Sequence, residues 1–149
     1  MTILDGSSTL LVVDDDPHMM NHLVTVIKRA LGEAINVEAL ADPNVARQRL
    51  DQGGIAILLT DLEMPHIDGR DLLRCAKRRN VCTQVLILVA QTSHAALLSA
   101  IEVGATDYLL KPVDQGEVVA LIAQAHDRHR RWQQALSRTW ESSMAHELR

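Results

Sequence analysis

The stretch IAILLTDLEMPHIDG, residues 55–69, decides how the rest of the chain is organised. It begins with the apolar run 55–59, and a short continuous run of this kind is typical of a central parallel strand covered on both faces. Asp61 stands at the exit of that strand, where open parallel sheets bind their ligands. Met64-Pro65 and Asp68-Gly69 then predict a loop before the next helix. Asp61 is therefore a candidate functional residue, although a single Asp after a strand more often serves a turn.

A similar order of strand-like run, breaker residues and amphipathic segment recurs along the chain, although residues 36–40 (NVEAL) alternate rather than forming a continuous apolar run. The other predicted strands are 9–13, 36–40, 84–89 and 106–110, and each is followed by a segment with helical periodicity. Five strands alternating with five helices predict an α/β fold, in which helices cover both faces of a parallel sheet.

Carboxylates also follow the first predicted strand, at Asp14 and Asp15. If the first and third strands are neighbours, these carboxylates and Asp61 converge at one edge of the sheet, and Lys111 can lie alongside at the end of the fifth strand. Clustered carboxylates repel one another, and a small set of oxygen ligands suits Mg²⁺. One carboxylate could then act as a nucleophile toward a phosphoryl group, with Lys111 as a positive charge. The alternative is that the acids cap helices and Lys111 pairs with one of them at the surface.

The segments LLVVDDDP, LLTDLEMPHIDG and GATDYLLKP, together with their spacing, identify a family resemblance. From residue 8 to about residue 127, the chain resembles the receiver domain of bacterial two-component response regulators. The resemblance implies a flavodoxin-like five-stranded parallel sheet with strand order 2-1-3-4-5. It also implies a sensor histidine kinase or a phosphotransfer protein as the partner, and phosphorelay signalling as the function.

The resemblance assigns a role to each candidate site residue. Asp61 would be the phosphoacceptor, catalysing its own phosphorylation together with Lys111, which would bind the phosphate. The bond between Lys111 and Pro112 would be cis. The implied Mg²⁺ ligands are the carboxylates of Asp14, Asp15 and Asp61, with Asp15 the more direct of the acidic pair, and the backbone carbonyl of Glu63.

One departure from the family pattern concerns the switch that follows phosphorylation. The family ends its fourth strand with Thr or Ser followed by Ala, whereas this chain has Val89 followed by Ala90. The resemblance implies that, where this hydroxyl is present, it bonds the phosphoryl group and the aromatic side chain at the position of Tyr108 turns inward behind it. This chain lacks the hydroxyl. Because a hydrogen bond to a charged group contributes about 1.5–3 kcal/mol, its loss predicts a muted conformational response. Thr92 or Ser93 could substitute if the loop is displaced.

The C-terminal part of the chain predicts a helix that extends beyond the receiver. We expect a receiver domain over residues 1–127 and a helical linker over 128–149 that leads to an output domain. Apolar residues recur along the linker at every fourth position, namely Trp132, Leu136, Trp140, Met144 and Leu148. This stripe predicts a parallel homodimer through the helix, and the alternative is a frayed linker that the intact protein covers. The terminal MAHELR resembles either a histidine-kinase phosphoacceptor box, with His146 as the phosphorylated residue, or the entry to an HD-GYP-type phosphodiesterase.

Composition excludes several classes of function. The formal net charge of −4 argues against a nucleic-acid-binding surface. No apolar run is long enough for a membrane span and no signal peptide is evident, so we expect a cytoplasmic protein without a membrane partner.

Cys75 and Cys82 are interpreted as reduced thiols without a function. His126 and His129 have a spacing that could bind a metal, but the adjacent arginines favour a solvated basic face.

Two other functions remain open at this stage. The first is a receiver-like domain that is insensitive to phosphorylation and acts as a protein-interaction and dimerisation module, as Val89 would suggest. The second is a small hydrolase that uses the carboxylates on a free substrate. It is the weaker alternative, because no His follows a predicted strand directly and no substrate pocket is evident.

Overall fold

A computed structural model describes residues 8–148, and it contains the expected five strands and five helices. In chain order the elements are β1 (Ser8–Val13), α1 (Pro17–Leu31), β2 (Ile35–Leu40), α2 (Pro43–Gln52), β3 (Ile55–Asp61), α3 (Gly69–Arg79), β4 (Gln84–Val89), α4 (His94–Val103), β5 (Asp107–Leu110) and α5 (Gln115–Glu147). The predicted strands differ from these bounds only at their ends. The α/β prediction is therefore confirmed.

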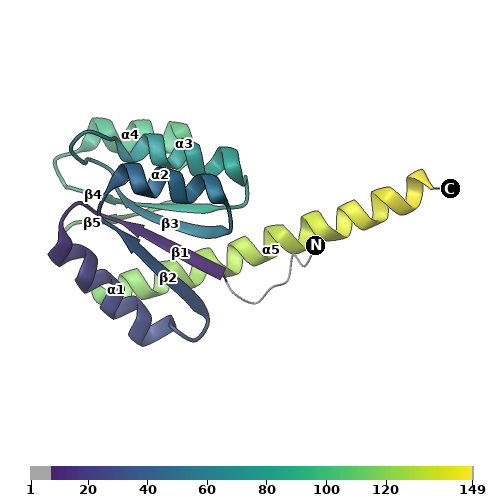
Figure 1. The fold of residues 1–149 in the computed structure, drawn as a ribbon, viewed down its shortest axis with the longest axis horizontal. Helices are drawn as coiled ribbons and strands as arrows, with labels where there is room; N and C mark the ends of the chain where they lie inside the picture. The colour runs from purple at the N-terminus through teal and green to yellow at the C-terminus, as the bar shows by residue number, and fades with distance from the viewer. Residues whose placement is uncertain (1–7, 149) are drawn as a thin grey trace.

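The sheet is parallel, with the order β2-β1-β3-β4-β5, as the resemblance implied. Helices α1 and α5 cover one face, and α2, α3 and α4 cover the other (Figure 1). Alternate residues of β3 point to opposite faces, so Leu58 packs under α2 and α3 while Ile57 and Leu59 pack under α1 and α5. This double burial explains why β3 is apolar at every position before Thr60.

Aspartates begin four of the five helices, all at the carboxyl-terminal edge of the sheet. The side chains of Asp16, Asp42, Asp68 and Asp114 each accept a hydrogen bond from a backbone N–H group in the first turn of the helix that follows. The Asp16 side chain therefore caps α1, whereas Asp14 and Asp15, the two residues before it in the sequence, belong to the acidic cluster. The loops that end at Asp16, Asp68 and Asp114 carry candidate site residues, namely Asp14 and Asp15, Glu63, and Lys111.

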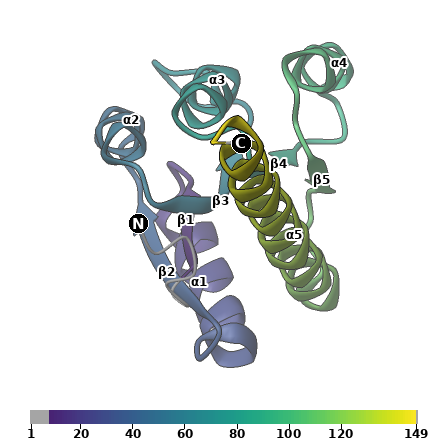
Figure 2. The ribbon, with the colours of Figure 1, turned by 90° about the vertical axis from the view of Figure 1, so that its right-hand side faces the viewer.

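Helix α5 is 33 residues long and projects past the sheet (Figures 1 and 2). Val118, Ile122 and Ala125 pack its first turns on the sheet, and the last buried residue is His129. Beyond this point four residues of the apolar stripe are exposed, with Trp132 at 57%, while Met144 is half-buried. Within residues 8–148, no helix combines the length and apolarity that crossing a membrane requires.

The prediction of a solvated basic face at His126 and His129 is wrong for His129. That side chain is only 4% exposed, and its Nδ1 lies 2.9 Å from the backbone oxygen of Cys82. His126 is half-buried, with Nε2 3.0 Å from the hydroxyl oxygen of Ser8. Helical spacing could not reveal this burial, because it depends on which strand starts lie beneath this turn of α5.

Candidate functional site

Three carboxylates meet where β1 and β3 end. Because these strands are neighbours in a parallel sheet, Asp14 and Asp15, which follow β1, lie beside Asp61, the last residue of β3. Each residue offers one carboxylate oxygen, and these oxygens all lie within 4.8 Å of one another. Asp14 and Asp61 are buried, whereas Asp15 is exposed. The predicted convergence of the three acids is therefore present in the structure.

Asp14 is the most constrained of the three, because its side chain has no exposed surface. Its Oδ1 accepts a hydrogen bond from the backbone N–H of Asp16 at 2.9 Å, and its Oδ2 is buried without a partner in the described part of the chain. Burial raises the pKa of this carboxyl, and the charges of Asp61 and Asp15 raise it further, against the Asp16 N–H and the charge of Lys111. An unpaired buried carboxylate oxygen beside two other carboxylates fits a divalent cation with oxygen ligands.

Lys111 reaches the acids from the end of β5. Its Nζ donates a hydrogen bond to Asp61 Oδ2 at 3.0 Å, although β4 separates the two strands in the sheet. The Lys111 side chain is 30% exposed and that of Asp61 is 9% exposed, so the ion pair is partly accessible to solvent, mainly on the Lys111 side. The peptide bond between Lys111 and Pro112 is cis, as the resemblance implied.

Two residues that support this site had no sequence signal for that role. The missing side chain of Gly69 lets the β3–α3 loop close over the strand end, because a Cβ there would lie 2.3 Å from the backbone oxygen of Asp61. The amide of Gln91 donates to the backbone oxygen of Lys111 at 3.2 Å. A glycine at the start of a helix and a glutamine in a loop predict no such contacts.

Glu63 lies in the loop after Asp61 and is exposed. Its backbone pairs with Asp68 in an isolated antiparallel bridge, and its carboxylate is not part of the acidic cluster. The role of its backbone carbonyl as a metal ligand stays a prediction.

The three residues predicted to form the switch lie on β4, on β5 and in the loop after β4. Val89 is buried, at 1% exposure, while Ala90 is exposed and Tyr108 is 46% exposed. Of the two possible substitutes for the missing hydroxyl, Thr92 is exposed and Ser93 is buried just before α4. The muted response stays a prediction.

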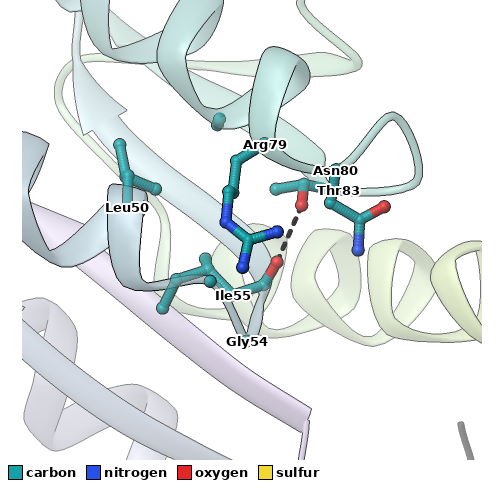
Figure 3. A pocket seen from close by; sticks show the side chains of 8 residues that line it. Leu50, Gly54, Ile55, Arg79, Asn80 and Thr83 are labelled. Atoms are coloured by element: carbon teal, nitrogen blue, oxygen red, sulfur yellow. Dashed lines mark hydrogen bonds between the residues drawn. The ribbon is translucent and has the colours of Figure 1, made fainter. Parts of the chain in front are cut away.

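A small pocket lies at the opposite, amino-terminal edge of the sheet (Figure 3). It lies between the ends of α2 and α3, where Arg79 enters it and donates from Nε to the backbone oxygen of Asp51 at 3.2 Å. At its wall, the hydroxyl of Thr83 donates to the backbone oxygen of Ile55 at 2.7 Å. This pocket belongs to the packing of the strand starts and is separate from the acidic cluster.

The sequence matches known proteins over most of its length. A family model described as the response regulator receiver domain matches residues 10–123. The DNA-binding transcriptional regulator NtrC of Salmonella typhimurium is 36% identical over 124 residues, which cover 83% of this chain and 26% of the relative. The transcriptional regulatory protein TrcR of Mycobacterium tuberculosis is 35% identical over 118 residues, which cover 78% of this chain and 44% of the relative. The chain thus spans less than half the length of these relatives.

Solved structures show the same fold. A putative response regulator from Chloroflexus aurantiacus superposes with a TM-score of 0.71 at 29% identity, covering 81% of this chain and 98% of that chain. The signal receiver domain of an HD domain-containing protein from Pseudomonas fluorescens superposes with a TM-score of 0.79, covering 88% and 95%, and at 20% identity this likeness concerns the fold alone. Taken with the acidic cluster at the strand ends, the match over residues 10–123 shows that the chain belongs to the response regulator receiver domain family.

Proposed function

We propose that Asp61 accepts a phosphoryl group from the phosphohistidine of a sensor kinase or a phosphotransfer protein, in Mg²⁺-dependent phosphorelay signalling. A receiver domain is a phosphoacceptor rather than a classical enzyme, and the family implies a histidine kinase as partner. The observation that carries the proposal is the cluster of Asp14, Asp15 and Asp61, with oxygens within 4.8 Å and with Lys111 Nζ 3.0 Å from Asp61 Oδ2.

The geometry supports different roles for the two oxygens of Asp61. Lys111 holds Oδ2, and no hydrogen bond from residues 8–148 reaches Oδ1. Oδ1 would attack the phosphorus atom, the bond from phosphorus to the donor nitrogen would break, and its electron pair would stay on that nitrogen. Lys111 would then stabilise the negative charge on the phosphoryl oxygens.

The metal ligands in this proposal are Asp14, Asp15, Asp61 and the backbone carbonyl of Glu63. The unpaired Asp14 Oδ2 supports this assignment, because a cation bound in the cluster would give this buried oxygen a partner. Bound Mg²⁺ would supply positive charge to the carboxylates and to the transferred phosphoryl oxygens.

We further propose that residues 1–127 act as the receiver and that 128–149 connect it to an output domain. The exposed stripe at Trp132, Leu136 and Trp140, at 57%, 52% and 66% exposure, supports pairing with a second copy through α5. The competing function is a dimerisation module that does not respond to phosphorylation, and the buried Val89 without a hydroxyl favours it.

The first test is phosphorylation of the full chain by a small phosphodonor such as acetyl phosphate, with and without Mg²⁺. We expect Mg²⁺-dependent labelling of the wild type and a loss of at least about 100-fold in D61N, since one atom takes the phosphoryl group. The matched control is D42N, which retains a side chain that can cap α2 and should be labelled like the wild type. Equal labelling of D61N and the wild type would refute the assignment.

The second test separates the two functions. Beryllofluoride with Mg²⁺ mimics the phosphorylated aspartate, and a switchable receiver should change its dimerisation or its tryptophan fluorescence when it binds. Binding without either change would favour the phosphorylation-insensitive module.

A further inference from the structure

At the amino-terminal edge of the sheet, α5 is attached through the buried ring of His129. Its Nδ1 lies 2.9 Å from the backbone oxygen of Cys82, and the side chain is only 4% exposed. A carbonyl oxygen can only accept, so Nδ1 carries the hydrogen and donates it. The neutral ring therefore satisfies this bond with its Nε2 unprotonated.

Two neighbouring side chains strengthen the attachment. His126 Nε2 lies 3.0 Å from the hydroxyl oxygen of Ser8, at the start of β1. Arg128 donates from Nη1 to the side-chain oxygen of Gln84 at 3.2 Å, at the start of β4. We call His126, Arg128 and His129 the latch. Through it, one turn of α5 is bonded to the amino-terminal ends of two central strands.

Beyond the latch, α5 projects past the sheet (Figures 1 and 2). No residue of α5 after His129 is buried in the part of the chain that the structure describes. Helices in proteins gain most of their stability from packing, and starting a new helical turn costs much more free energy than adding residues to an existing turn. The helical state of residues 130–147 therefore depends on propagation from the latched turn.

We propose that the latch is a proton-controlled attachment: neutral His129 keeps α5 as one continuous helix, and protonation of His129 releases the segment from residue 126 onward. A second proton would place a positive charge in a buried site. The charged group that interacts electrostatically with His129 is His126 of the same helix. From the loop before β4, the Cys82 carbonyl accepts the hydrogen bond of His129, and the Cys82 thiol is the titratable group. The charge of Lys77 on α3 lowers the pKa of that thiol, and no carboxylate of the described chain shifts the pKa of His129.

The direction of the pH effect follows from these surroundings. Burial lowers the pKa of His129 from 6.5, and the charge of His126 lowers it further, against the Cys82 carbonyl, which raises it. The released ring would titrate near its ordinary value. The latch is therefore complete above about pH 6.5 and is weakened as the pH falls from there toward the lowered pKa, by up to about tenfold per pH unit. This inference does not depend on phosphorylation of Asp61.

The test uses the full chain between pH 7.5 and pH 5.5. Both tryptophans, Trp132 and Trp140, lie beyond the latch, so their fluorescence reports this segment alone. We expect their emission to change as the pH falls, and amide protection after His129, corrected for the intrinsic exchange rate, to fall relative to β3. The proposal would be overturned if the tryptophan emission stayed constant and the amide protection after His129 did not fall relative to that of β3.

Two variants assign the effect to one ring. H129Q can still donate to the Cys82 carbonyl but does not titrate, so it should lose the pH response, whereas H126Q should keep it. An H129Q response equal to that of the wild type would overturn the proposal. If H129Q does not fold, the NMR titration of His129 in the wild type decides: a pKa below 6.5 supports the latch and a pKa at or above 6.5 overturns it.

Discussion

The two edges of the sheet bury polar groups in opposite ways. At the carboxyl-terminal edge, Asp14 Oδ2 is buried without a partner beside two other carboxylates. At the amino-terminal edge, the buried ring of His129 and the hydroxyl of Thr83 each bond a backbone carbonyl. An unpaired buried charge costs stability unless a ligand compensates it, whereas a paired neutral group costs little. The difference separates an edge whose acids could hold a metal ion from an edge that holds a helix.

The edges also respond to protons with opposite signs. The pKa of Asp14 is raised in the folded protein, so protonation of this group stabilises the fold as the pH falls. The pKa of His129 is lowered, so protonation of that group destabilises its attachment. Acid therefore relieves the repulsion at one edge and weakens the latch at the other.

The largest expected effect tests how tightly the carboxyl-terminal edge is built. In G69A the new Cβ would meet the backbone oxygen of Asp61 at 2.3 Å and Leu62 Cα at 2.9 Å, and backbone atoms cannot move aside cheaply. We expect a loss of about 3 kcal/mol in the free energy of unfolding, measured by urea denaturation, together with weaker Mg²⁺ binding. The control is G116A in the first turn of α5, where the nearest atom is 3.4 Å away. Equal stability of the two variants would contradict this account of the loop.

The second prediction is a gain, rather than a loss, in the free energy of unfolding. D14N keeps an oxygen for the Asp16 N–H and removes the repulsive charge, so we expect the metal-free protein to gain about 1–2 kcal/mol at pH 7. The gain should shrink as the pH falls toward the raised pKa of Asp14, because the wild-type carboxyl is then neutral as well. Thermal unfolding without metal at several pH values measures both effects.

The matched control for D14N is D42N, which should change stability little, because Asn caps helices about as well as Asp. Added Mg²⁺ should stabilise the wild type and D42N more than D14N. A less stable D14N in the absence of metal would mean that the carboxylates are not in conflict.

The smallest effects come from a reciprocal pair near the two ends of β4. T83V removes a hydroxyl that is bonded at 2.7 Å, and V89T inserts one at a buried position next to the proposed site. Each should cost about 1 kcal/mol in urea denaturation. Only V89T should also enlarge the change in amide exchange of residues 90–93 caused by beryllofluoride, because it restores the hydroxyl that the family pattern places at this position. An equal enlargement in T83V would show that the change reflects general loosening.

Much of the fold and part of the site could be predicted from the sequence. Continuous apolar runs indicated β1, β3 and β4, because a strand buried on both faces leaves a continuous apolar signal. The edge strands β2 and β5 are only partly buried, and β2 was indicated by its alternating pattern. The contact of Asp61 with Lys111 was harder to predict, since it crosses β4 and depends on where β5 ends in the sheet. The resemblance supplied the strand order that local patterns cannot supply.

The amino-terminal edge shows where sequence reasoning failed. His129 lies among arginines in the sequence, which favoured a solvated position, yet it is buried over Cys82. The two residues are 47 positions apart, and only the crossing of α5 over the start of β4 brings them together. Gly69 is similar, because a glycine at the start of a helix does not reveal that an added Cβ would lie 2.3 Å from the backbone oxygen of Asp61.

The sequence by itself determined the strands, the helices and the acids at the strand ends, because each follows from the order of residue types along a short segment. The tertiary structure alone decided that Asp14 is left with an unpaired oxygen and that His129 is buried and paired. It also decided that α5 leaves the body at the edge opposite to Asp61 (Figure 1). Burial and pairing are properties of neighbours in space, and residues far apart in the chain become neighbours only when the sheet and its helices assemble.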